Sequence, residues 1–165
     1  MLIDRKTGAV NLGSGGTIMP RMSRRQFEET GLIDLTRAPD SDGPSVRYHL
    51  RPIPAGDHWW RSIIYFHGQR LQQLSLHFAN TQELGSWESW SQEEQAQTKS
   101  YHEALLRADL GEPHRARITN SGVREDALRT TVSYKFAWGE VVSGYDAKAS
   151  TIHLTITFKR RFLFF

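Results

Sequence analysis

Cysteine is absent from this sequence of 165 residues. Its absence excludes disulfide bonds, metal sites built from thiolates and any mechanism that uses a thiol nucleophile. The fold must therefore be held together by a hydrophobic core, and a chain of this length can bury a substantial core without covalent cross-links.

Long apolar runs are also absent. No segment approaches the ~20 consecutive apolar residues that a membrane-spanning helix needs. Residues 1–6 do not contain an apolar stretch of the length found in signal peptides. We therefore predict no membrane span and expect a cytoplasmic protein.

A strong excess of charge of either sign is missing as well. Basic residues outnumber acidic ones by only 21 to 18, the net charge is +3, and the basic residues are scattered in small sets. A nucleic-acid-binding domain gathers such charge on one face, often beside exposed aromatic side chains. We expect solvated surface charge, and a weakly basic nucleic-acid-binding domain stays an alternative.

Alternation of apolar and polar residues is the strongest pattern present, and it is clearest in residues 130–158. One side of the two outer strands carries Val132, Tyr134, Phe136, Ile152, Leu154 and Ile156, and the other carries Ser133, Lys135, His153, Thr155 and Thr157. One apolar and one polar face in each strand is typical of an antiparallel sheet that is covered on one side. We predict a three-stranded meander here, and we expect the long helix described below to pack on its apolar face.

Further strands are predicted upstream, at residues 46–51, 59–67 and 73–78, where similar patterns recur. The first should end at Pro52, because proline cannot donate a hydrogen bond to a ladder. Residues 36–45 are rich in Pro, Gly, Asp and Ser, which predicts an exposed loop.

Two helices are predicted from their capping signals. The segment from Ser91 to Glu94 has the form of a capping box, so a long helix should begin there and stop at Gly111. Ser23 should cap a shorter helix over residues 24–30. The long helix is expected to turn Ala96, Tyr101, Ala104, Leu105 and Ala108 toward the sheet, and Glu93, Lys99, His102, Glu103 and Arg107 toward solvent.

The predicted fold is α+β: a single antiparallel sheet of about seven to eight strands, with one long and one short helix packed on one face. The length is close to the commonest domain size, so we expect one domain over residues 1–165.

Motifs for catalysis or metal binding are missing from the sequence. The seven histidines lack the i, i+4 pairing that a His-Glu-x-x-His site requires. His49, His77 and His153 could project together from the polar face of the sheet and form a site, but separate solvated side chains are the simpler interpretation. The glycines at 13, 15 and 16 are not followed by the Lys-Ser/Thr of a phosphate-binding loop. We predict no catalytic residue, no metal and no cofactor.

Five tryptophans offer another kind of site. Trp59, Trp87 and Trp90 lie where a strand or helix begins, so they could be partly exposed and anchor a protein partner. With Lys135 and His153 of the polar sheet face, they are the candidate partner-binding residues. Ordinary sealing of the core is the competing interpretation for the tryptophans.

Three segments resemble a set of small uncharacterised bacterial proteins. These are the hairpin Ile3-Asp4-Arg5-Lys6-Thr7-Gly8, the segment Trp87-Glu88-Ser89-Trp90-Ser91 that leads into an acidic helix, and the meander from Trp138 to Lys148. The tail from Phe162 to Phe165 departs from that pattern. Such proteins are suspected to be immunity partners in bacterial toxin systems, and the resemblance supplies no catalytic residues.

Two functions from different classes follow from these observations. The preferred one, which the resemblance implies, is a non-enzymatic immunity protein that covers a cognate toxin encoded nearby, with an interface of roughly 800 Å² on each partner. The other is a small enzyme or ligand-binding domain that uses the polar face of the sheet, with His77 and His153.

Overall fold

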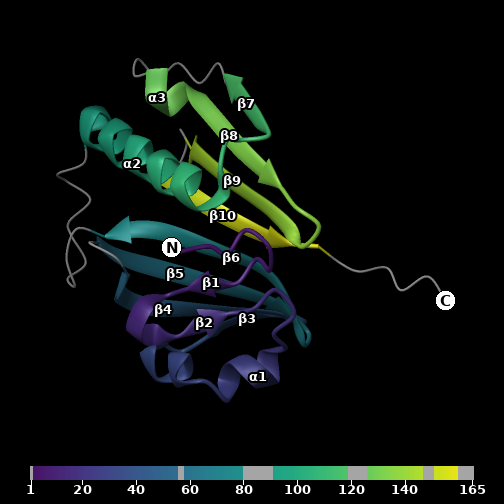
Figure 1. The fold of residues 1–165 in the computed structure, drawn as a ribbon. Helices are drawn as coiled ribbons and strands as arrows, with labels where there is room; N and C mark the ends of the chain where they lie inside the picture. The colour runs from purple at the N-terminus through teal and green to yellow at the C-terminus, as the bar shows by residue number, and fades with distance from the viewer. Residues whose placement is uncertain (1, 56–57, 80–90, 119–125, 147–150, 160–165) are drawn as a thin grey trace.

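The computed structural model describes residues 2–55, 58–79, 91–118, 126–146 and 151–159 (Figure 1). The N-terminal part contains β1 (Val10–Asn11), a 3-10 helix (Gly13–Gly15), β2 (Thr17–Ile18), α1 (Arg24–Glu28), a second 3-10 helix (Gly31–Leu35), β3 (Asp40–Asp42), β4 (Ser45–Ala55), β5 (His58–His67) and β6 (Arg70–Ala79). The C-terminal part contains α2 (Gln92–Leu110), β7 (Arg115–Ile118), α3 (Asp126–Arg129), β8 (Thr130–Lys135), β9 (Gly139–Asp146) and β10 (Thr151–Phe158).

The fold is α+β, as predicted from the sequence. Eight strands form one antiparallel sheet in the order β3-β4-β5-β6-β10-β9-β8-β7, and β1 and β2 form a separate small pair. The predicted meander of residues 130–158 is confirmed as β8, β9 and β10. The strands before and after α2 meet where β10 pairs with β6, so the two halves of the chain share one sheet.

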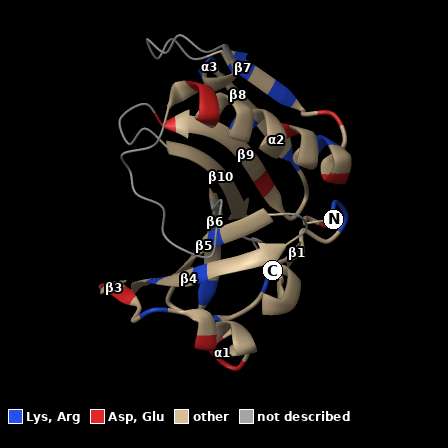
Figure 2. Ribbon diagram, turned by 90° about the vertical axis from the view of Figure 1, so that its left-hand side faces the viewer, with Lys and Arg blue, Asp and Glu red and all other residues tan. Residues whose placement is uncertain are grey.

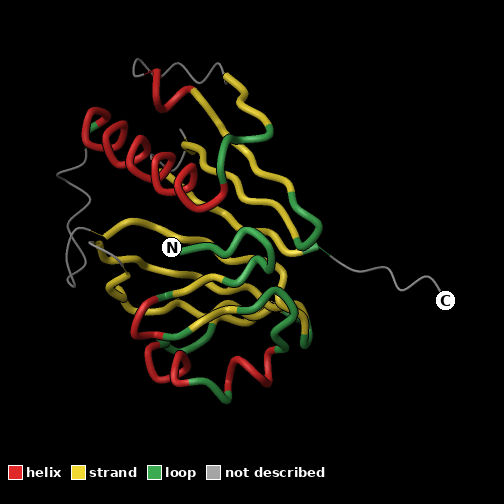
Figure 3. The backbone as a smooth tube through the Cα atoms, in the orientation of Figure 1, coloured by secondary structure: helices red, strands yellow, loops and turns green. Residues whose placement is uncertain are grey.

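The hydrophobic core lies on the apolar face of this sheet. It combines the inward residues of the strands, such as Ile64, Leu74 and Ile156, with Leu106 of α2 and Phe27 of α1. The long helix α2 lies along β9 and β10, whereas α1 lies against the β3–β6 half of the sheet (Figure 3). The helices therefore cover one face, as expected.

The bounds of α2 match the prediction, but the face that it turns to the sheet matches only in part: Ala96 is buried and Tyr101 and Leu105 pack against the core, as predicted. Ser91 and Glu94 form the capping box, and Gly111 ends the helix with φ +85. The buried positions are Gln95, Ala96, Lys99, His102, Leu106 and Leu110, and Ala104 and Ala108 are exposed. Leu106 and Leu110 fix the rotation of the helix against the core, and residues 99 and 102 lie on the same side because side chains three and four apart share a face. The expectation that Lys99 and His102 face solvent was wrong.

Two strand predictions also need correction. β4 continues through Pro52 and Pro54 to Ala55, with a register shift between Leu50 and Ile53. β3 pairs with β4 only along Ser45–Arg47, so Pro52 and Pro54 lie beyond this ladder. At their positions β3 does not require the backbone N–H that proline lacks. The predicted loop of residues 36–45 contains the exposed edge strand β3.

In the part of the chain that the structure describes, no helix is long and apolar enough to cross a membrane.

Candidate functional site

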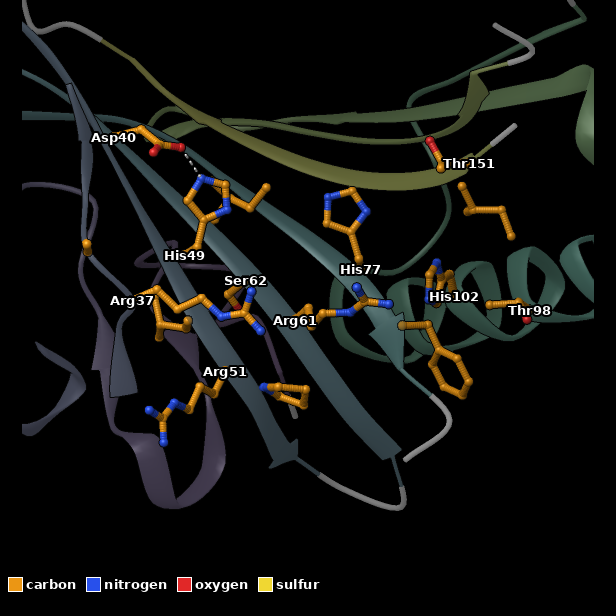
Figure 4. Close-up of a pocket in the computed structure, with 16 residues that line it drawn as sticks. Arg37, Asp40, His49, Arg51, Arg61, Ser62, His77, Thr98, His102 and Thr151 are labelled. Atoms are coloured by element: carbon orange, nitrogen blue, oxygen red, sulfur yellow. Dashed lines mark hydrogen bonds and ion pairs between the residues drawn. The ribbon is translucent and has the colours of Figure 1, made fainter. Parts of the chain in front are cut away.

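A cleft of about 520 Å³ opens beside the polar side of β4, β5 and β6 (Figure 4). The ladder between β6 and β10 runs from Gln73–Thr157 to Leu76–Leu154. Beyond it, His77 and Phe78 on one side and Ile152 on the other border the cleft. The inner end of the cleft is lined by Thr98 and His102 of α2, on the helix-bearing side of the sheet.

Strand register determines which side chains share the polar side of this cleft. Arg61 of β5 stands opposite His77 of β6, and His49 of β4 stands opposite Ile63 of β5. Residues 49, 61, 63 and 77 therefore project from the same face, because side chains alternate along each strand. Figure 4 shows the side chains of His49, Arg61 and His77 directed into the space below β10.

The cleft is rich in cations. Arg37, Arg51 and Arg61 line it, and among the described lining residues Asp40 is the only acid. That carboxylate is paired with the Nε2 atom of His49, 3.0 Å away. Figure 2 shows the basic positions of β4 close to the acidic residues of the edge strand β3. The charge of the lining therefore favours an anionic ligand.

Arg61 supplies a hydrogen-bond donor that is not in use. Its Nε atom is buried, and it has no hydrogen-bond partner in the described structure. A buried N–H group without an acceptor costs free energy, and a charged one costs more. An anion within reach of this atom would remove that cost.

His77 is the neighbour of Arg61 across the β5–β6 ladder. Burial lowers its pKa below the ordinary value, the positive charges of Arg61 and His153 lower it further, and a hydrogen bond with the backbone of Ile152 opposes the shift. The imidazole is therefore mostly neutral near pH 7. A bound anion would offset the charge of Arg61 and favour the protonated form of His77.

His102 forms the polar end of the cleft inside the core. Its side chain is 0% exposed, and its ring stacks on Trp60 with centroids 5.1 Å apart. Neither ring nitrogen has a hydrogen-bond partner in the described structure. Burial, aided by the positive charges of His77, Lys99 and His58, lowers its pKa to about 4. His102 is thus a neutral imidazole at pH 7, with one donor and one acceptor unused.

Lys99, one turn before His102 on α2, is also 0% exposed. Its ammonium group is paired with Glu103, four residues along the helix. The positive charge of Lys99 is therefore compensated within the helix.

Of the predicted partner-binding residues, Trp59 and Lys135 are not brought together. Lys135 is exposed. Successive register partners on neighbouring strands lead from it across the sheet, through Glu140, Thr157 and Gln73, to Tyr65 of β5. Trp59 lies six positions from Tyr65 on β5, which is about 20 Å along the strand direction at ~3.3 Å per residue. Trp59 and Lys135 therefore occupy opposite corners of the same face, and Trp87 and Trp90 lie outside the described residues.

His153, the remaining predicted residue, is half-buried in the middle of the polar face. Its ring packs on Gly144, where an added Cβ would lie 2.9 Å from its Cε1 and Nε2 atoms. Burial lowers its pKa, and Asp146 opposes the shift. His153 thus shares the polar face with His77 but does not line the cleft.

The three-histidine hypothesis is not supported. Within residues 2–55, 58–79, 91–118, 126–146 and 151–159, no three His, Asp or Glu side chains are grouped so that they could hold a metal ion. His49 and His77 both line the cleft, and neither is a fully solvated strand residue.

Arg61 and His102 were not among the predicted site residues. The sequence of β5 indicates apolar residues on both faces, so Arg61 was not identified as a site residue. His102 was assigned to the wrong side of α2. A sequence signal for His102 does exist: it lies four and eight positions before Leu106 and Leu110, the two leucines of one helical face.

Comparison of the chain with family models, curated proteins and solved structures found no match.

A second hollow, of about 830 Å³, lies at the end of the sheet near Lys159. Four cations line it, namely Lys6, Arg21, Arg70 and Lys159, and the described lining contains no acid. The indole of Trp138 forms part of its wall, stacks on Phe136 at 5.0 Å and donates its N–H to the carbonyl of Arg5 at 3.0 Å.

Proposed function

We propose that the protein is a binding domain for a small organic anion, which occupies the cleft beside β4, β5 and β6. The observation that carries this proposal is the buried, unpartnered Nε atom of Arg61. It lies in a cleft whose one acid, among the described residues, is already paired with His49. Binding, rather than catalysis, is the proposed activity.

The physical reason is electrostatic balance. Arg61 and His77 face the same cleft, and the charge of Arg61 disfavours the protonation of His77. A carboxylate or phosphate group would accept the free N–H of Arg61, and hydrogen bonds to a guanidinium are stronger than those between neutral groups. A cleft of about 520 Å³ is within the range of small-molecule sites.

Isothermal titration calorimetry of the full chain with phenylacetate and with inorganic phosphate tests the proposal. We expect one of the two anions to bind, and Arg61→Gln to weaken that binding about tenfold or more. The matched control is Arg25→Gln, because the Arg25 side chain is 82% exposed on α1 and pairs only with nearby Glu29 among described residues. Absence of binding by both anions, or equal binding by wild type and Arg61→Gln, would contradict the proposal.

We propose protein binding as the second candidate, and the second hollow favours it. Lys6, Arg21, Arg70 and Lys159 suit an acidic segment of a partner, and Trp138 offers an apolar wall. A toxin of the kind that the resemblance implies is the predicted partner, so this protein should rescue the growth of cells that express its neighbouring toxin-like gene. Rescue should weaken in Arg21→Glu and survive in Arg25→Glu. Failure to form a complex with any neighbouring gene product would argue against this candidate.

A further inference from the structure

We infer that the ligand of the cleft is an organic acid with an apolar body and a hydroxyl group at the end opposite its anion, and that His102 binds this hydroxyl. The inference rests on the proposed anion-binding function. It concerns the inner end of the same cleft, which lies at α2 rather than at the arginines.

The first step of the argument is the unused capacity of His102. The side chain is fully buried, and neither Nδ1 nor Nε2 has a hydrogen-bond partner in the described structure. Buried polar groups in proteins are nearly always partnered, so a buried imidazole that lines a cleft points to a ligand group. Figure 4 shows the ring at the cleft, close to Thr98 of α2.

The second step concerns the kind of group that fits. His102 is neutral at pH 7, because its pKa is lowered to about 4, so it offers one N–H donor and one lone-pair acceptor. A hydroxyl group also both donates and accepts, so it can use either ring nitrogen. A second carboxylate only accepts hydrogen bonds, so it could take the N–H of the neutral imidazole but would leave the lone pair of the other nitrogen unused.

The third step concerns the body between the two ends. Ile63, Phe78 and Ile152 also line the cleft. The surroundings of His102 are aromatic: Trp60 stacks on its ring, and the ring of Phe78 lies 5.9 Å away. An aryl ring would suit such walls, because aromatic pairs are favourable at these separations.

The test uses two acids that differ in one atom, 4-hydroxyphenylacetate and phenylacetate, titrated into the full chain. We expect wild type to bind the hydroxylated acid at least tenfold more tightly, because a site that supplies a buried hydrogen-bond partner discriminates against an analogue that lacks the hydroxyl. In His102→Phe the preference should fall below twofold. In Arg61→Gln both acids should lose affinity by a similar factor.

The outcomes separate the inference from the function on which it rests. Binding of both acids to wild type with equal affinity would overturn the inference and leave the anion-binding proposal standing. A preference that persists in His102→Phe would also overturn it. Binding of neither acid would contradict both proposals for this class of ligand.

A second measurement does not depend on the folding of a variant. In wild type, the ¹⁵N chemical shifts of the His102 imidazole should change when 4-hydroxyphenylacetate is added, and they should change much less with phenylacetate. Unchanged ¹⁵N shifts at saturation with the hydroxylated acid would refute the contact.

Discussion

Replacing His102 with phenylalanine should stabilise the free protein, and the gain should increase as the pH falls. The native imidazole is buried with both nitrogens unpartnered in the described structure, so the fold bears the cost of desolvating them. Phenylalanine keeps a flat ring on Trp60, which stacks with the imidazole at 5.1 Å. Removing a buried unsatisfied polar group is worth about 1–3 kcal/mol before any cost of fitting the larger ring.

The pH-dependent part of the effect follows from linkage. The pKa of His102 is about 4 in the folded protein, against an ordinary value of 6.5 for histidine. Because the folded value is the lower one, the unfolded chain binds the proton more readily, and stability is lost as the pH falls from about 6.5 toward 4. The full loss is about 3 kcal/mol at 1.36 kcal/mol per pKa unit, and about 2 kcal/mol of it should be reached by pH 5.

Urea unfolding at pH 7 and pH 5, followed by circular dichroism, measures this effect. The difference between His102→Phe and wild type should be about 2 kcal/mol larger at pH 5, and other titrating groups largely cancel in that difference. Parallel pH dependences for the two proteins would refute the claim that His102 is buried in its neutral form.

Three further predictions concern the helix cap, the meander and the cleft. Ser91→Ala should lower the free energy of unfolding by about 1 kcal/mol, because the serine oxygen caps α2, and the same urea titration detects the loss. Gly139→Ala should destabilise the protein clearly more than Gly31→Ala. A Cβ at Gly139 would lie 2.2 Å from the carbonyl oxygen of Thr157, whereas a Cβ at Gly31 would have no described atom beyond its chain neighbours within 4 Å. Equal thermal midpoints for the two variants would contradict this prediction. Phenylacetate should bind more tightly at pH 6 than at pH 8, by up to tenfold per pH unit. The reason is that His77, whose pKa is lowered in the free protein, takes up a proton when the anion binds. Calorimetry in two buffers of different ionisation enthalpy measures that proton uptake.

Local signals explain which parts of the fold could be predicted. The ends of α2 follow from Ser91, Glu94 and Gly111, whose effects act within one turn of the helix. The meander follows from alternation, because each strand has one buried and one solvated side. The short edge strands β3 and β7 lack this signal, since every residue in both is exposed.

The rotation of α2 could not be predicted, because it depends on tertiary packing. Alanines and Tyr101 suggested one apolar side, but Leu106 and Leu110 enter the core and carry Lys99 and His102 inward with them. The burial of a lysine and a histidine goes against their usual preference. For this reason the inner end of the cleft was not predicted, although the spacing of His102 from Leu106 and Leu110 was a signal for it.

The prediction that His77 projects from the polar face of the sheet is confirmed. Its partner Arg61 was not predicted, because it belongs to a strand whose other residues are mainly apolar. The pairing of Arg61 with His77 comes from the register of β5 and β6, which the sequence does not specify directly.

The central claim is that an anion binds beside Arg61 and His77, and the titration of His77 by NMR, with and without saturating phenylacetate, tests it most directly. In the free protein the pKa of His77 should lie below its ordinary value, as burial and Arg61 require. With the acid bound it should rise in wild type, and at the same acid concentration the rise should be smaller in Arg61→Gln. A His77 titration curve that is the same in the presence and absence of the acid in wild type would contradict the account.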